Sequence, residues 1–425
     1  MQFRAHQAAP NPRAISPPGD TSIALRKSLR VVERIQNLRS LSLVGPCLLL
    51  VGLAFIVPML LMLMRSIEND EVLNTFPLVS AELQSWESGA LPAEPAFAAL
   101  AEDLKRAKAE RTLGVAGRRL NLEVSGFLDL LLATGRTIQT LPTSTTSWKD
   151  ALISIDQRWG EPQYWNAIKK NTHSFTDFYF LTAVDLKRGV DGVQAVPQEQ
   201  RLYANIIVRT LVISLAVTAL CLVIAYPIAF TIASASSGIA NFLLLLVLLP
   251  FWTSILVRSA AWIILLQRDG VVNSILLRMG AIDAPLELIF NRFGVVLALT
   301  HVLLPYMVLT LYSVMKGIDH HYTRAARSLG ANAWQAFRMV YLPQTYAGVA
   351  SGSLLVFILA IGSYVTPALI GGRTDQMIAQ SIAFNMNQTV NWGLAAALSV
   401  LLLAMVLSLY ALYGRVADTN IKAGR

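Results

Sequence analysis

The sequence predicts an all-α membrane protein of six transmembrane helices, with a mostly helical insertion between the first and second of them. Of its 425 residues, 54% are hydrophobic and only 14% are charged, whereas an average soluble domain has about 25% charged residues. Six apolar segments are long enough to cross a bilayer, which takes about 20 residues in a helix. One long polar segment separates the first two and contains no apolar run of that length.

The predicted spans cover residues 41–64, 206–232, 239–266, 293–315, 346–369 and 393–413. The first could instead be a cleaved signal peptide. It is long for that role, starts about forty residues into the chain and has no small-residue cleavage site before Arg65, so we expect a retained span. The short turn at 233–238 predicts that the second and third spans form a helical hairpin.

The insertion, residues 65–204, differs in composition from the rest of the chain. Residues 66–200 hold 18 of the 26 acidic side chains and 13 basic ones. Segments 97–107 and 120–133 have the apolar spacing of helices. The apolar run at 127–132 is too short to cross a bilayer and predicts a helix buried in a soluble core.

The distribution of basic residues predicts the orientation. The chain carries a formal charge of +9, and basic residues concentrate on the cytoplasmic side of membrane proteins. They cluster in the tail 1–40, in the loop 316–345 and near the C-terminus. We therefore expect a cytoplasmic N-terminal tail, a cytoplasmic C-terminal tail at 416–425, and an insertion on the outer side. The core, residues 205–415, includes the cytoplasmic loop.

Several other functions lack support in the sequence. No basic stripe interleaved with aromatic residues suggests nucleic-acid binding. Cys47 and Cys221 lie in apolar runs and are expected to be packing residues. We expect no metal site and no enzymatic activity, because the sequence has neither metal-ligand spacing nor a phosphate-binding glycine loop. Adjacent His320 and His321 are expected to lie in a solvated loop.

The cytoplasmic loop has the pattern of two short helices. Thr323 could cap a first helix that Gly330 ends, because glycine accepts the left-handed conformation common at helix ends. Asn332 could cap a second helix through Tyr341, and Pro343 would mark its end or a turn into the fifth span. Residue chemistry alone leaves two interpretations open: a docking surface for a partner, or a plain connection between spans.

This loop resembles the EAA loop of ABC-importer permeases, in which Glu-Ala-Ala is followed at fixed spacing by glycine, isoleucine and Leu-Pro. The matching residues here are Ala325, Ala326, Gly330, Val340, Leu342 and Pro343. Arg324 stands where the family usually has glutamate, so any contact specific to that carboxylate is in doubt. The resemblance implies the type I ABC importer permease fold and a coupling helix that docks on a separate ATPase.

Other segments resemble the spermidine/putrescine branch of that family. They are Tyr226-Pro227, the Pro250–Ser254 segment with Arg258, Gly270–Asn273, Ser363–Gly372 and Asn391–Gly393. The resemblance implies passage of a small solute, such as a polyamine, from a periplasmic binding protein into the cytoplasm. It further implies a bacterial inner membrane, an ATPase dimer that holds ATP and magnesium, and a second permease, as a heterodimer in preference to a homodimer.

The substrate pathway is the least defined feature. Arg258, Trp252, Tyr364 and Thr366 are candidates to line it, and packing or snorkelling is the alternative role for each. No carboxylate lies well inside a predicted span, so we expect cargo selection to reside in the binding protein. An ion-coupled secondary transporter would need ionisable residues at mid-membrane, and a membrane sensor would need a large cytoplasmic domain.

Overall fold

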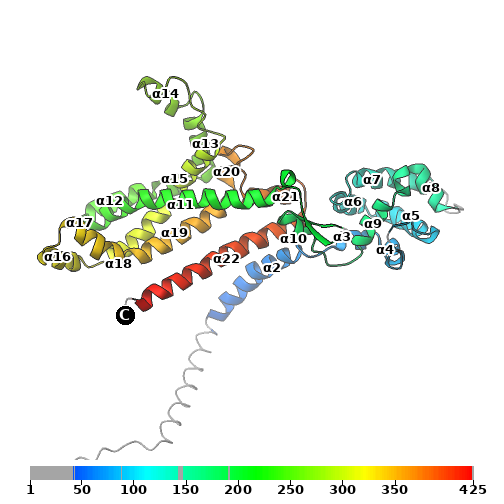
Figure 1. The fold of residues 1–425 in the computed structure, drawn as a ribbon, viewed down its shortest axis with the longest axis horizontal. Helices are drawn as coiled ribbons and strands as arrows, with labels where there is room; N and C mark the ends of the chain where they lie inside the picture. Colours follow the sequence, from blue (N-terminus) through cyan, green and yellow to red (C-terminus); the bar gives the residue numbers. More distant parts are fainter. Residues whose placement is uncertain (1–41, 43, 88, 142–146, 190–191, 424–425) are drawn as a thin grey trace, which may run out of the picture. The chain divides into compact units, whose positions relative to one another are not determined.

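The chain is built almost entirely of helices, as the sequence predicts (Figure 1). The structure is a computed structural model that describes residues 42 and 44–423, except 88, 142–146 and 190–191. The predicted N-terminal tail, residues 1–40, lies outside the described residues. The chain divides into two units, Met1–Met62 and Leu63–Arg425, which are described separately.

The first unit holds most of the first predicted span. A helix runs over Val44–Met64 with a mean hydropathy of 2.8. It contains a π-helical stretch, η1 (Gly52–Ile56), ahead of α2 (Val57–Met64). The N–H of Val57 donates to the carbonyl of Gly52, the i→i+5 bond that defines a π-turn.

The second unit begins with a bundle of short helices, which we call the insertion bundle. Its elements are α3 (Asp70–Thr75), α4 (Pro77–Gln84), α5 (Glu94–Ala109), α6 (Leu113–Asn121), α7 (Phe127–Thr137), η2 (Ile138–Thr140), α8 (Trp148–Ile155), η3 (Gln157–Gly160) and α9 (Pro162–Lys170). Isolated helices of this length are marginal in water. Packing of their apolar faces must therefore stabilise them.

Large aromatic side chains form the centre of the insertion bundle. Phe97, Phe127, Trp159 and Trp165 are fully buried, and the ring centroids of Phe97 and Trp165 lie 4.4 Å apart. Both indoles satisfy their N–H groups. Trp159 donates to Thr134 Oγ1 at 2.9 Å, and Trp165 donates to the backbone carbonyl of Trp159 at 2.9 Å. A soluble-type core therefore exists in the polar segment, as its composition predicts.

One predicted helix in this bundle is divided. Residues 120–133 have helical spacing, but α6 ends at Asn121 and α7 begins at Phe127. Gly126 adopts a positive φ of 85°, and its N–H donates to Asn121 Oδ1 at 2.8 Å. The amide side chain thus closes a turn that apolar spacing does not reveal. Within α7, Phe127 and Leu130 are buried, which confirms a core helix there.

A short linking region follows the insertion bundle. It contains α10 (Phe178–Ala183), the antiparallel strands β1 (Leu186–Gly189) and β2 (Gly192–Ala195), and η4 (Gln198–Gln200). Asp185 precedes β1, and its carboxylate accepts hydrogen bonds from the N–H groups of Leu202, Tyr203 and Ala204 at 3.2, 3.2 and 2.7 Å. These N–H groups begin the next helix, so Asp185 caps it.

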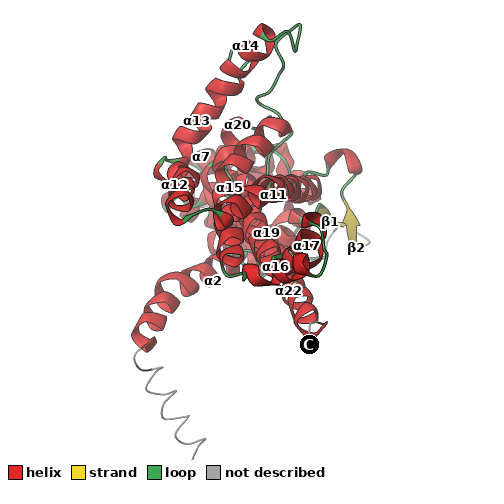
Figure 2. Ribbon diagram, turned by 90° about the vertical axis from the view of Figure 1, so that its left-hand side faces the viewer, coloured by secondary structure: helices red, strands yellow, loops and turns green. Residues whose placement is uncertain are grey.

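Long apolar helices dominate the rest of the second unit. They are α11 (Tyr203–Ser234), α12 (Ser237–Leu248), η5 (Leu249–Trp252), α13 (Ile255–Leu266), α14 (Val271–Arg278), α15 (Arg292–Lys316), α19 (Tyr346–Ile361), α20 (Val365–Ile370), α21 (Ile378–Asn387) and α22 (Trp392–Ala423). The close succession of α11 and α12 confirms the predicted hairpin. Figure 2 shows α11, α15 and α19 gathered together, with α13 and α14 extending away from them.

Small residues bring α19 close to α15. A Cβ on Gly348 would lie 3.0 Å from Val314 Cβ, and one on Gly352 would lie 2.9 Å from Met307 Sδ. Glycine at both positions lets the two backbones approach, as at many helix interfaces in membranes. Met307 is fully buried in this contact.

Two predicted spans are broken, which corrects the expectation of continuous helices. The segment 239–266 is interrupted between α12 and α13 by η5, whose Pro250 has no N–H to continue a helix. The segment 346–369 is interrupted at Gly362–Tyr364, between α19 and α20. Hydropathy does not detect these breaks, because the residues on both sides are apolar.

The number of membrane-length helices is five among the described residues, or up to six if a bent pair counts as one span. The pair consists of Ala333–Gln344 and Tyr346–Ile361, which meet at an angle of 58°. The helix over Ser237–Trp252 is apolar but shorter. A multi-pass helical membrane protein follows from these lengths and compositions.

Candidate functional site

The segment between α15 and α19 forms a helical hairpin, which we call the 319–345 hairpin. Its elements are α16 (His320–Ser328), α17 (Ala333–Ala336), the π-type turn η6 (Phe337–Tyr341) and α18 (Leu342–Gln344). The predicted pair of short helices is therefore present. The second helix is interrupted by η6 and continues past the predicted end at Tyr341.

The cap of the first helix differs from the expected one. Asp319 is the N-cap, and its Oδ1 accepts a hydrogen bond from the N–H of His321 at 2.8 Å. Thr323 lies inside α16, and its hydroxyl donates to the carbonyl of His320 at 2.9 Å. Asp319 is a better N-cap than Thr323 because its carboxylate also interacts favourably with the positive end of the helix dipole.

The turn of the hairpin depends on Gly330. Its φ of +96° lies in the left-handed region that side chains disfavour. The N–H of Ala331 donates to the carbonyl of Ala326 at 3.1 Å, which closes the helix end. An added Cβ would meet no atom within 4 Å, so glycine is needed here for backbone conformation rather than for space.

The second helix begins with the predicted cap. Asn332 Oδ1 accepts from the N–H of Gln335 at 2.8 Å, and Gln335 Oε1 accepts from the N–H of Asn332 at 2.9 Å. This reciprocal pair is a capping box. Each helix of the hairpin thus has one of its first N–H groups bonded by a capping side chain of the hairpin itself.

The outer surface of the hairpin is apolar and basic. Leu329 is 89% exposed, Met339 73% and Trp334 66%. Arg324 and Ala325 are exposed on α16, and Ala326 is half-buried. Apolar side chains with this exposure are typical of a surface that another protein covers.

Val340, Leu342 and Pro343 lie where the hairpin rejoins the membrane helices. Val340 and Leu342 are half-buried, and Pro343 is exposed. Pro343 follows η6, whose last hydrogen bond runs from the N–H of Leu342 to the carbonyl of Phe337, and proline has no N–H to continue that series. The 58° bend that follows is stabilised at Thr345, whose hydroxyl bonds Leu342 O at 2.7 Å and Tyr226 OH at 3.2 Å.

An aromatic cluster joins the hairpin to α11. Phe337 packs edge-on against Tyr226 and Phe230 of α11, with ring centroids 6.2 and 5.9 Å apart. It also stacks between Trp334 and Tyr341 at 5.7 and 6.0 Å. Phe337 is therefore the centre of the contact between the hairpin and a membrane helix. The spacing of residues 334, 337 and 341 could have indicated one aromatic face, but it could not identify the opposite helix.

The four candidate pathway residues lie at or after the helix breaks. Trp252 ends η5 and is 77% exposed, while Tyr364 caps α20 and is exposed. Thr366 is fully buried, and its hydroxyl lies 3.3 Å from that of Ser259 on α13. The structure thus brings Thr366 next to the turn of α13 that carries Arg258.

Arg258 is half-buried with an incomplete set of partners. Its Nε and Nη1 atoms are buried and have no hydrogen-bond partner among the described residues. Nearby on α13, Trp262 donates to His301 Nδ1 of α15 at 3.3 Å. A guanidinium in a membrane helix is costly without a partner or water, so this position requires one of them.

The linking region is anchored to the start of α22. Tyr179 is buried, and its hydroxyl donates to Glu71 Oε2 at 3.2 Å. A Cβ on Gly393 would lie 2.3 Å from the Tyr179 ring, so only glycine fits there. Burial, with Glu71 beside the hydroxyl, raises the pKa of Tyr179 above its ordinary range. Sequence reasoning noted Gly393 but could not identify its neighbour.

Arg119 connects the insertion bundle to this anchor. Its Nε donates to Asn69 Oδ1 at 3.1 Å, and its Nη2 lies 3.3 Å from Glu123 Oε1. The guanidinium carbon lies 4.1 Å from the ring centroid of Phe178. This buried cation–π contact was not expected from the sequence, because its members are about fifty residues apart or more.

The structure has several apolar helices long enough to span a membrane, which defines a multi-pass membrane protein. Between two of them, α15 and α19, lies an exposed helical hairpin whose surface suits a protein partner. The chain belongs to the family described as binding-protein-dependent transport system inner membrane component, whose family model matches residues 225–419. It is therefore a permease component of an ABC importer. The insertion bundle lies outside the matched residues.

Its relatives match about half of this chain. The spermidine/putrescine transport system permease protein PotB of Haemophilus influenzae is 35% identical over 212 residues, which cover 49% of this chain and 74% of that protein. PotB of Escherichia coli is 35% identical over 201 residues, covering 47% and 73%. The inner membrane ABC transporter permease protein YdcU of Escherichia coli is 30% identical over 221 residues, covering 48% and 70%.

Among solved structures, a bacterial ABC transporter involved in the import of alginate matches 50% of this chain and 79% of its own. The TM-score is 0.40 and the sequence identity 19%. A likeness of this size supports no detailed comparison.

Proposed function

We propose that this permease passes a polyamine, such as spermidine or putrescine, into the cytoplasm. The identity of 35% to the PotB permeases over about three quarters of their length supports this cargo. The polyamine would be delivered by a periplasmic binding protein. Because no carboxylate lies well inside a predicted span, selection among cargoes would occur in that binding protein.

The coupling site is the 319–345 hairpin. Its exposed apolar and basic side chains, together with Ala325, Ala326 and Gly330 at the spacing of the EAA loop, would dock on a separate ATPase subunit. Two ATPase copies would bind ATP and magnesium, and a second permease would complete the pore. The aromatic cluster around Phe337 would transmit movement of the hairpin to α11, because the two elements share that packed contact.

The topology in this proposal has six spans with both termini in the cytoplasm. The broken segments 239–266 and 346–369 would each count as one span, and the insertion, residues 65–204, would be periplasmic. The excess of basic residues in 1–40, 316–345 and the C-terminal tail supports this orientation.

The pathway would run past the two helix breaks. Trp252 and Tyr364 are exposed and offer aromatic faces, which attract ammonium groups. Thr366 would hold α20 against α13 through Ser259. Arg258 would face the pore or the second permease, since its unpaired nitrogens need a partner.

The test is ATPase activity of the chain co-purified with its co-encoded partners in lipid. Binding protein loaded with spermidine or putrescine should stimulate ATP hydrolysis. Ala326→Arg and Gly330→Asp should abolish this stimulation, because the first adds bulk to the docking surface and the second strains the turn. Ala81→Arg, at an exposed alanine of α4, is the matched control and should have no effect.

Two results would overturn the proposal. Stimulation by a different cargo alone would refute the polyamine assignment. Absence of a co-purified ATPase, with normal uptake in the hairpin variants, would refute coupling and favour an ion-driven secondary transporter.

A further inference from the structure

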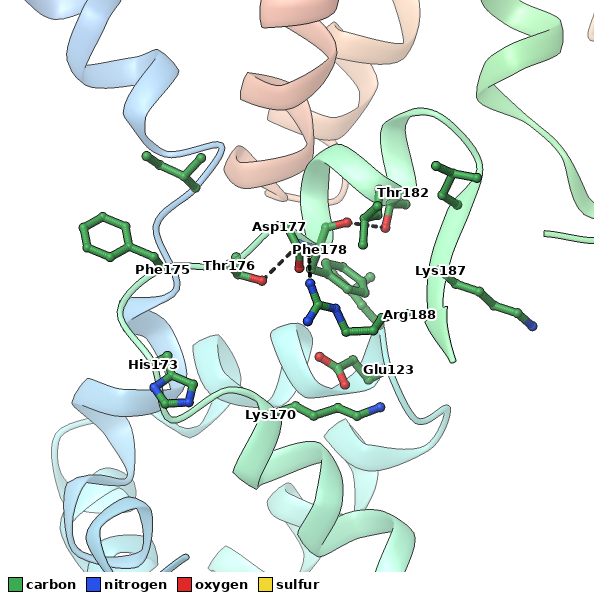
Figure 3. Close-up of a pocket in the computed structure, with 14 residues that line it drawn as sticks. Glu123, Lys170, His173, Phe175, Thr176, Asp177, Phe178, Thr182, Lys187 and Arg188 are labelled. Atoms are coloured by element: carbon green, nitrogen blue, oxygen red, sulfur yellow. Dashed lines mark hydrogen bonds and ion pairs between the residues drawn. The ribbon is translucent and has the colours of Figure 1, made fainter. Parts of the chain in front are cut away.

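A basic pocket of about 830 Å³ lies between the insertion bundle and the linking region (Figure 3). Its basic side chains come from both sides: Lys170 and His173 from the end of α9 and beyond it, Lys187 and Arg188 from β1. Leu181 and Leu186 provide apolar wall. Neither the family resemblance nor coupling to an ATPase involves this pocket.

The acidic groups of the pocket are already neutralised by residues of the chain. Asp177 pairs with Arg188, as Figure 3 shows. Glu123 Oε1 lies 3.3 Å from Arg119 Nη2 and accepts from Asn171 Nδ2 at 2.8 Å. The ammonium groups of Lys170 and Lys187 have no hydrogen-bond or ion-pair partner among the described residues. The pocket therefore presents uncompensated positive charge.

The walls of the pocket lie at the ends of membrane helices. Ile67 lines it only three residues after the end of the Val44–Met64 span. Leu186 follows Asp185, whose carboxylate caps the first N–H groups of α11. Phe178 is next to Tyr179, which packs on Gly393 in the first turn of α22. These connections place the pocket at the depth of the lipid headgroups.

We propose that this pocket binds the headgroup of an anionic phospholipid. The phosphate would lie near Lys170, and the acyl chains would leave along Leu181 and Leu186. A cation near a membrane surface strengthens binding of an anionic lipid by about five-fold. A bound headgroup would join the insertion bundle to the linking region without new protein contacts. The proposal uses only the chain's position in a membrane and is independent of its cargo.

The experiment compares amide hydrogen exchange of the full-length chain in nanodiscs of phosphatidylcholine alone and of phosphatidylcholine with phosphatidylglycerol. The anionic lipid should slow exchange in α10 and β1 by at least about five-fold. The double variant Lys170→Gln/Lys187→Gln should lose this protection. Lys108→Gln/Lys149→Gln removes two insertion lysines that do not line the pocket and should retain it.

Several outcomes would refute a lipid site. Equal exchange in the two nanodiscs would exclude a preference for anionic lipid. Loss of protection in the control variant would show a general effect of charge. Protection by inorganic phosphate in phosphatidylcholine alone would identify a site for a free anion, and protection only after adding binding protein would identify a protein contact. Failure of the ATPase test above would leave each of these outcomes unchanged.

Discussion

At the scale of residues, single glycines decide where distant parts of the chain can touch. Gly393, in the first turn of α22, lets the Tyr179 ring pack against the helix backbone, because a Cβ there would lie 2.3 Å from that ring. Tyr179 in turn bonds Glu71 of the insertion bundle. One missing side chain thus permits the anchor between the linking region and the last span.

We expect Gly393→Ala to destabilise this anchor. Overpacking of a tight contact costs about 1–3 kcal/mol, so thermal unfolding of the purified chain should begin several degrees lower. Tyr179→Leu removes the ring atoms that an added methyl would meet. The double variant Gly393→Ala/Tyr179→Leu should therefore lose less stability than the sum of the single changes.

Gly414→Ala is the matched control on the same helix, since a Cβ there meets nothing within 4 Å. It should leave the unfolding temperature unchanged or raise it slightly, because alanine favours helix. Equal losses at positions 393 and 414 would contradict a specific contact with Tyr179.

A second residue-scale feature is the buried carboxylate of Asp103. Its oxygens accept from the N–H of Val79 at 2.9 Å and from Arg106 Nη2 at 3.1 Å. Burial nevertheless dominates and raises the pKa of Asp103 from 3.8 to about 6. The folded chain therefore keeps a proton on this group between about pH 4 and 6, where the unfolded chain has released it.

Because the pKa is raised on folding, Asp103 contributes less to stability as the pH rises through this window. Asp103→Asn cannot titrate. The free energy of unfolding of Asp103→Asn minus that of the native chain should therefore rise by about 2 kcal/mol between pH 4 and pH 7. Urea unfolding of residues 66–176 expressed alone, followed by tryptophan fluorescence, measures this difference. A difference that is independent of pH would show that Asp103 titrates normally.

At the scale of elements, the hairpin is folded by its own caps but positioned by α11. Asp319, Gly330 and Asn332 define its helices and turn through local hydrogen bonds. Phe337 contacts both α11 aromatic rings, Tyr226 and Phe230, while Tyr341 contacts Phe230. The caps and the aromatic cluster therefore have separable roles.

We expect Phe337→Ala to separate docking from transmission. The caps remain, so the ATPase should still co-purify. Loss of the shared packing should reduce stimulation of ATP hydrolysis by loaded binding protein about five-fold or more, the range of typical coupling energies. The measurement is ATPase activity with and without binding protein, alongside the amount of ATPase bound.

Phe384→Ala is its control, because Phe384 is an exposed aromatic residue of α21 away from the hairpin. Stimulation should be unchanged in that variant. Normal stimulation in Phe337→Ala would remove the aromatic cluster from the coupling path.

At the scale of the whole molecule, the insertion bundle leaves and rejoins the chain at one place. The N–H of Asn69 donates to Ser174 O at 2.9 Å, and the N–H of Thr176 donates to Ile67 O at 2.8 Å. The bundle also has a closed aromatic core of its own. These features are typical of a domain that folds independently.

Residues 66–176 expressed alone should therefore be soluble and unfold in one cooperative transition. Trp159→Ala should lower the free energy of unfolding by about 3–5 kcal/mol, because this indole is fully buried. Trp148→Ala, at a partly buried indole on the edge of the core, should cost less. Circular dichroism against urea measures both. A non-cooperative transition in the native segment would contradict independent folding.

The sequence alone determined the features that arise from local chemistry. Hydropathy identified the long apolar helices and the polar segment that follows the first of them, and side-chain type identified the Asn332 cap and the Gly330 turn. It also identified the EAA-like spacing that agrees with the family. These signals lie within one or two helical turns, so no knowledge of distant residues is needed to read them.

Only the tertiary structure decided which distant residues meet. The breaks at Leu249–Trp252 and Gly362–Tyr364 are flanked on both sides by apolar helices, so hydropathy does not show them. The first helix of the hairpin offered two residues able to cap it, and the structure uses Asp319 in place of Thr323. The partners Tyr179 and Gly393 are more than two hundred residues apart. Such contacts depend on how packed helices bring side chains together, and no local pattern of sequence encodes that.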